Sequence, residues 1–144
     1  MKKEDLPNKL AVFPLSNFII FPKTTVPLNI FEPRYIQMID EAMKGDRIIG
    51  IVQPKKTGDL KKPNLYNVGC AGKITSFNET EDGRYLIILN GICRFKIMSE
   101  EENDKLYRIC KVNFSEYLED LNKKNEDINL NDLKFIFSEL KNFF

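Results

Sequence analysis

Apolar residues follow strand-like spacing through most of this chain, and prolines interrupt them near its start. Proline lacks an N–H donor and fixes φ, so it is confined to strand ends, edges, turns or the first turn of a helix. Four prolines fall within a short stretch, at Pro14, Pro22, Pro27 and Pro33. This punctuation predicts two short strands, at about residues 10–15 and 24–30, joined by a loop that carries residues 18–21.

A helix is predicted directly after the second strand, over residues 33–44. Pro33 suits the first helical position, Glu32 lies at the positive end of the helix dipole, and Phe31 is placed to staple the incoming chain. Apolar residues then recur at helical spacing, followed by Gly45 as a stop signal: Tyr35, Met38, Ile39, Ala42 and Met43. Phe31 and Tyr35 are therefore expected in the core, with a role in a contact surface as the alternative.

Residues 48–52 form a continuous apolar run between turn residues, which is consistent with a buried strand. Residues 53–63 contain two prolines and a glycine, and their composition predicts an exposed loop. This loop carries four lysines, Lys55, Lys56, Lys61 and Lys62. A solvated loop is favoured over a phosphate-binding patch, because no aromatic residue alternates with the charges.

Residues 64–114 have the pattern of an antiparallel meander. Its first strand, at about 68–77, contains Gly69 and Gly72, and glycine inside a strand indicates a bulge or the close approach of another backbone. In its later part Cys93, Phe95 and Ile97 alternate with charged residues, so one face is apolar. The phase changes further on, which predicts a bulge or a switch of faces near Ile109.

Two turn signals divide the meander. Asp82-Gly83 predicts a tight turn into a strand at 85–89, and Asn90-Gly91 predicts a hairpin because both residues accept positive φ. With the two amino-terminal strands, at least seven strands are expected. The fold class is therefore α+β, mainly β: a small, partly closed barrel with one helix across it.

The carboxyl-terminal part differs in composition from the barrel. Residues 115–129 are rich in Glu, Asp, Asn and Lys, which suits a linker or a solvated helix. An apolar stripe at helical spacing follows, formed by Leu133, Ile136, Phe137, Leu140 and Phe144. It predicts a terminal amphipathic helix that the barrel or a partner chain must cover.

Length and charge fit one ordinary domain. The chain has 144 residues and a formal net charge of +1, so nothing draws it as a whole to nucleic acid or to an anionic membrane. Prolines break the apolar run near the amino terminus, which argues against a signal peptide, and no apolar stretch is long enough to span a membrane. We expect a cytoplasmic protein in which Cys70, Cys93 and Cys110 are small core residues.

No motif in the sequence predicts catalysis. The run from Gly69 to Thr75 superficially resembles a phosphate-binding loop, but Asn67 stands where the first glycine belongs and Ile74 where the hydroxyl residue belongs. The chain has no histidine, which excludes histidine-based triads and histidine metal sites. Acidic pairs flank predicted turns and are interpreted as solvated. A serine or cysteine nucleophile assisted by lysine has no local motif in its favour.

Five ordered blocks of this sequence resemble the amino-terminal domain of the Lon protease family. Each block alone is weak, but their order across about residues 10–98 makes the likeness specific. They are 10–15 with Phe21-Pro22, then 27–35, 45–50, 65–74, and 82–85 with Gly91, Arg94 and Phe95.

The resemblance implies a PUA-like barrel followed by a helical part. In full-length Lon this region is non-catalytic and contributes to the recognition of protein substrates and to hexamer assembly. The chain departs from the family after its last strand, where one clear helix stands in place of several. We therefore expect a barrel domain at 1–114, and a linker and reduced or truncated helical part at 115–144.

The favoured function is a non-catalytic polypeptide-binding module without cofactor or metal. Its partners would be unfolded or specific polypeptides, with a homo-oligomer formed through the terminal helix as a further option. The expected contact residues lie in the loop before the second strand and at the start of the helix: Phe18, Phe21, Phe31, Glu32, Arg34 and Tyr35.

Two other functions remain open at this point. RNA binding, common among PUA-like folds, would need six basic residues on one face: Lys55, Lys56, Lys61, Lys62, Arg94 and Lys96. The other alternative is a structural domain that dimerises through its terminal helix.

Overall fold

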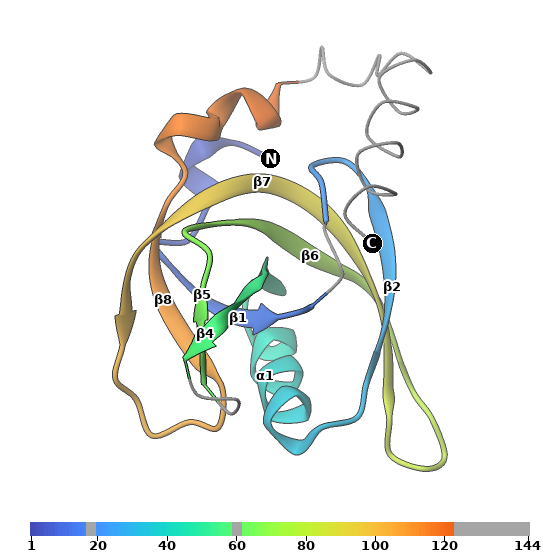
Figure 1. The fold of residues 1–144 in the computed structure, drawn as a ribbon. Coiled ribbons are helices and arrows are strands. Elements are labelled where there is room, and N and C mark those ends of the chain that lie inside the picture. Colours follow the sequence, from blue (N-terminus) through green and yellow to red (C-terminus); the bar gives the residue numbers. More distant parts are fainter. Residues whose placement is uncertain (17–19, 59–61, 123–144) are drawn as a thin grey trace.

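The computed structural model describes residues 1–16, 20–58 and 62–122, and it confirms the mainly β, α+β fold (Figure 1). The predicted contact residue Phe18 and the predicted terminal helix lie outside the described residues. The elements are η1 (Lys3–Asp5), β1 (Lys9–Pro14), β2 (Thr25–Ile30), α1 (Pro33–Lys44), β3 (Ile48–Val52), β4 (Pro54–Gly58), β5 (Pro63–Leu65), β6 (Val68–Glu79), β7 (Tyr85–Glu101), β8 (Arg108–Asn113) and η2 (Ser115–Leu121).

Strand β7 organises the sheet. The strand order is β2-β7-β6-β3-β1-β8, and a further pairing between β7 and β8 closes β6, β7, β8, β1 and β3 into a ring. The first half of β7 lies between β2 and β6, while its second half also pairs with β8. Figure 1 shows this long strand arching over the barrel, with β2 along one side.

Two apolar cores lie on opposite faces of the sheet, which explains why β3 is buried along its whole length. Ile49 and Ile51 pack in the first core with Met38 and Ile39 of α1. Alternate residues of β3 point the other way, into the barrel, where they meet Phe95. A helix on one face and a closed barrel on the other thus leave no residue of β3 exposed.

The helix has the predicted bounds, with Pro33 at its first position and Gly45 after its last turn. Tyr35 is buried, as expected. The prediction that Phe31 belongs to the core is wrong, because its side chain is 65% exposed. The alternation of β2 points Ile30 inward and therefore turns Phe31 outward at the junction with the helix.

The Asn90-Gly91 hairpin prediction is also wrong, because β7 runs through both residues as one strand. The turn before β2 packs directly on this point: Lys23 N donates to Gly91 O and Gly91 N donates to Thr24 O, each at 2.8 Å. A Cβ atom on Gly91 would lie 1.9 Å from the carbonyl oxygen of Phe21. Gly91 therefore allows a close backbone approach, whereas the predicted positive φ belongs to the Asp82-Gly83 turn, with Gly83 at 84°.

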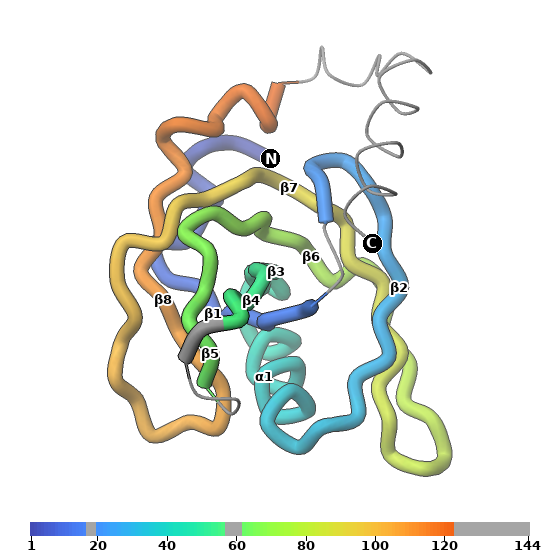
Figure 2. The backbone as a smooth tube through the Cα atoms, in the orientation of Figure 1, coloured from blue at the N-terminus to red at the C-terminus, as the bar shows by residue number. Residues whose placement is uncertain are grey.

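The lysine-rich stretch is not a plain loop. Its two ends pair as β4 and β5 in a separate two-stranded ribbon, which the sequence did not predict because its composition is that of a turn. The backbone trace in Figure 2 shows this ribbon beside β8. The bulge or switch of faces predicted near Ile109 is wrong, because β8 pairs with β1 in continuous register and its alternate residues enter the two different cores. The register shift in this pair lies on β7, between Ile97 and Ser99.

The segment after the last strand closes one end of the barrel. Asp120 of η2 is buried and accepts hydrogen bonds from the backbone N, Nε and Nη2 of Arg94 on β7, at 2.9 to 3.0 Å. The Arg94 guanidinium also lies over the Tyr117 ring.

None of the helices that the structure describes is long and apolar enough to cross a membrane.

Candidate functional site

A polar groove of about 770 Å³ opens where four parts of the chain meet. Its walls are the end of β1, the start of α1, the β5 end of the ribbon, and the hairpin loop between β7 and β8. We call it the hairpin groove. Its lining includes the side chains of Arg34, Tyr35, Lys62, Glu100, Leu106, Tyr107 and Arg108.

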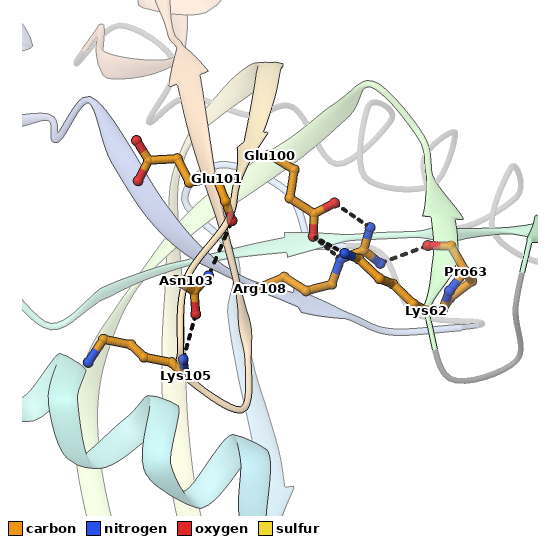
Figure 3. A network of polar contacts seen from close by, with 7 residues as sticks. All are labelled: Lys62, Pro63, Glu100, Glu101, Asn103, Lys105 and Arg108. Carbon is orange, nitrogen blue, oxygen red and sulfur yellow. Dashed lines mark hydrogen bonds and ion pairs between the residues drawn. The ribbon is translucent and has the colours of Figure 1, made fainter.

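Arg108 ties the ribbon to the hairpin (Figure 3). Its Nε and Nη2 donate to the two carboxylate oxygens of Glu100, at 2.6 and 2.9 Å, and its Nη1 donates to Pro63 O at 2.7 Å. Lys62 Nζ lies 3.9 Å from the same carboxylate. The hydrogen bond with Arg108 holds the pKa of Glu100 below its usual value. This wall is thus a fixed, charge-paired structure.

The hairpin is also clamped to α1. Lys105 Nζ donates to both carboxylate oxygens of Glu41, at 2.7 and 2.8 Å, and the Tyr107 hydroxyl donates to Glu41 Oε2 at 2.7 Å. These hydrogen bonds lower the pKa of Glu41. The backbone N of Leu106 donates to Gln37 Oε1, while the Leu106 side chain is exposed. The clamp therefore fixes the hairpin and presents an apolar side chain beside the groove.

The start of the helix supplies the opposite wall. The Tyr35 ring stacks on Phe13, with centroids 4.2 Å apart, and the Arg34 guanidinium carbon lies 4.6 Å from the ring centroid of Tyr35. Arg34 Nη2 donates to Glu32 Oε1 at 3.1 Å. Arg34 is thus held by two contacts, one to the Tyr35 ring and one to Glu32, where it lines the groove.

The structure brings together only part of the predicted contact surface. Arg34 and Tyr35 line the groove, Glu32 is the ion-pair partner of Arg34, and Phe31 is exposed just before it. Phe21 lies at the other end of β2, where its carbonyl accepts hydrogen bonds from Thr24 in the turn against Gly91.

Sequence reasoning missed the hairpin side of the groove. The run from Glu100 to Glu102 was interpreted as a solvated turn, although Glu100 and Glu101 are both engaged in ion pairs. The available signal for a binding wall was the aromatic and basic pair Tyr107-Arg108 shortly after that acidic run. This signal could be interpreted only with the knowledge that β7 and β8 pair and bring the two stretches together.

The described residues offer little for catalysis. No cluster of three or more His, Cys, Asp or Glu among them is placed to hold a metal ion. Burial raises the pKa of the three free thiols, to about 12 for Cys70 and Cys93 and to about 11 for Cys110. A thiol with so high a pKa is a poor nucleophile.

The comparisons with known proteins agree on one family. Residues 9–142 match a family described as the ATP-dependent protease La (LON) substrate-binding domain. The chain is 31% identical over 127 residues to a Lon protease of Cytophaga hutchinsonii, covering 86% of this chain and 16% of that protein. It is 30% identical over 123 residues to a Lon protease of Syntrophus aciditrophicus, covering 81% and 16%. The chain thus spans less than a fifth of these curated relatives.

Solved structures show the same fold. The Lon N-terminal domain protein from Xanthomonas campestris superposes with a TM-score of 0.61 at 23% identity, covering 74% of this chain and 59% of that chain. The N-terminal domain of a Mycobacterium avium complex Lon protease superposes with a TM-score of 0.56 at 16% identity, covering 74% and 54%.

Proposed function

The chain belongs to the Lon substrate-binding domain family and is a substrate-recognition module; from this premise we propose that it holds an extended segment of an unfolded polypeptide in the hairpin groove. The proposal assigns the chain no chemistry of its own. ATP hydrolysis and peptide-bond cleavage would belong to other domains or to a separate enzyme.

The observation that carries the proposal is the construction of the groove. Its walls come from segments far apart in the chain and are fixed by the Arg108 and Glu41 contacts, so the site is preformed. Its lining includes the charged side chain of Arg34 from the start of the helix and the exposed, apolar side chain of Leu106 from the hairpin loop. Such a mixture suits an extended peptide, whose backbone needs hydrogen bonds and whose side chains include apolar ones.

Two finer points are proposals as well. Free, buried thiols suit a reducing compartment, so we place the chain in the bacterial cytoplasm. We also keep self-association through the predicted terminal helix as a proposal, to be tested by sedimentation at several concentrations with and without residues 130–144. RNA binding is less favoured, because the Arg94 guanidinium that it would need is already bound by Asp120.

The proposed site is tested by reversing the charge of Arg34. The probe is a reduced, carboxymethylated and fluorescently labelled protein that stays unfolded in buffer, and the readout is its anisotropy during titration with the chain. We expect micromolar binding by the wild type. The affinity of R34E should be about tenfold lower, because the substitution removes the N–H donors that Arg34 offers to a bound polypeptide and places a negative charge beside Glu32.

The matched control is R84E. Arg84 pairs with Asp82 at 3.1 Å, as Arg34 pairs with Glu32 at 3.1 Å, but it lies at the turn between β6 and β7. R84E should bind within about twofold of the wild type. Thermal melts should be alike for both variants. Equal affinities of R34E and R84E would remove the hairpin groove as the site.

A further inference from the structure

We propose that the Tyr35 hydroxyl and the Arg34 guanidinium form a subsite for a carboxylate of the bound polypeptide. This inference rests on the proposed function and specifies what one position of the hairpin groove recognises.

Tyr35 is a buried tyrosine whose hydroxyl has no partner among the described residues. Its side chain is only 5% exposed, yet it lines the groove. Tyr85 and Tyr107 each donate their hydroxyl to a carboxylate, at 2.6 and 2.7 Å, and no such bond is formed by Tyr35. Among the described residues, the Tyr35 hydroxyl is therefore left available to donate a hydrogen bond to a group bound in the groove.

Tyr35 lines the groove, and its hydroxyl oxygen is not among the enclosed side-chain atoms that lack a hydrogen bond, of which Gln53 Nε2 is the one found in the described residues. Burial raises the pKa of Tyr35 against the opposing effect of Arg34, so the hydroxyl is protonated and able to donate at neutral pH.

Arg34 supplies the charge at this position. One of its N–H groups is bound to Glu32, and the others form no hydrogen bond to a described residue. The guanidinium carbon lies 4.6 Å from the centroid of the ring that carries this hydroxyl, and both side chains line the groove. The second guanidinium nearby, that of Arg108, has one N–H of each of its three nitrogens bound to Glu100 or Pro63, and the Glu100 carboxylate offsets its charge.

A carboxylate matches these donors better than any other group of a polypeptide. It accepts hydrogen bonds only, and its two oxygens fit the forked N–H groups of arginine. Of the acidic residues that line the groove, Glu100 is paired with Arg108 and Glu101 with Lys9, while Glu102 opposes the binding of a carboxylate. The carboxylate would come from an acidic side chain or from the end of a chain.

The test compares three labelled peptides that share one repeating unit of four residues. The first residue of the unit is Glu or Gln, and the other three are Phe, Ser and Leu. The first has Glu and blocked ends, the second has Gln and blocked ends, and the third has Gln and a free carboxyl terminus. We expect at least one carboxylate peptide to bind about tenfold more tightly than the blocked Gln peptide, as charge-assisted hydrogen bonds require. Which of the two binds better identifies the source of the carboxylate.

Tyr35→Phe then removes the hydroxyl and keeps the ring on Phe13. This variant should bind the carboxylate peptide with about fivefold lower affinity than the wild type, and its affinity for the blocked Gln peptide should change much less. The melting temperature of the variant should equal that of the wild type. The matched control is Y117F, since Tyr117 also lies under an arginine, with Arg94 4.8 Å from its ring centroid, but outside the groove. This variant should bind like the wild type.

Each outcome decides the inference. If unfolded polypeptide binds through Arg34 but the three peptides bind equally, or Y35F has the same effect on all three, the carboxylate subsite is wrong and the proposed function stands. If neither the unfolded protein nor any peptide binds, both the proposed function and the subsite are wrong.

Discussion

Gly91→Ala probes the backbone contact on which the barrel and its first loop depend. The new Cβ would lie 1.9 Å from the Phe21 carbonyl oxygen, where real Cβ contacts stay above 3.0 Å, so the turn must move by roughly 1 Å. This movement breaks the two hydrogen bonds that join Gly91 to Lys23 and Thr24, each worth about 1 kcal/mol. With strain of about 1–2 kcal/mol added, the free energy of unfolding should fall by about 3–4 kcal/mol.

Two other glycines calibrate this value. Gly83 has a φ of 84° and no atom within 4 Å of a built Cβ, so G83A should cost about 1 kcal/mol for the left-handed conformation alone. Gly45 has a φ of −111° and its nearest atoms at 3.9 Å, so G45A should stay within about 0.5 kcal/mol.

Urea titrations followed by circular dichroism measure all three variants, with the midpoint and the slope fitted separately. The expected order of destabilisation is G91A, then G83A, then G45A. A G91A variant that loses no more stability than G83A would refute the reasoning, because that is the result expected if Gly91 served only as a turn residue.

Two further predictions concern stability and the groove wall. The hydrogen bond to Asp40 and burial raise the pKa of Tyr85 from 10.0 to about 12, so the folded state holds this proton more tightly. The contribution of this proton to the free energy of unfolding should be complete below pH 10 and should be lost as the pH rises towards about 12. Y85F should show a smaller decrease in the free energy of unfolding over this pH range. An identical pH profile for Y85F would show that the Tyr85 hydroxyl is not responsible. Replacing Arg108 with Ala frees Glu100 and the Pro63 carbonyl, so amide exchange at Leu65 should accelerate about tenfold while the core stays protected. An unchanged exchange rate at Leu65 would show that the ribbon of β4 and β5 is stable without the Arg108 side chain.

Local signals in the sequence were sufficient for the helix and for most strands. Pro33 and Gly45 mark the ends of α1 because each acts on its own stretch of backbone, through a fixed φ and a missing side chain. The alternation around Phe95 gave the inward face of β7 correctly. In these cases the cause and the structure lie within a few residues of one another.

The errors arise where the cause is distant in sequence. Asn90-Gly91 has the composition of a hairpin, but the turn of residues 21–24 packs on it from another part of the chain. Only the helix side of the hairpin groove contains residues that the sequence predicted. Arg34 and Tyr35 follow Pro33, whose place at the start of a helix can be recognised from the sequence. Their counterpart Arg108 reaches the groove only through barrel closure.

The most direct test of the central claim is to map where an unfolded polypeptide contacts the chain. Amide chemical shifts of the nitrogen-labelled chain would be followed by NMR during titration with the carboxymethylated probe. We expect the largest changes at Tyr35 and at residues 103–108, on the two walls of the hairpin groove. Changes confined to the exposed face of β7 at Leu86 and Ile88, with the groove unaffected, would contradict it.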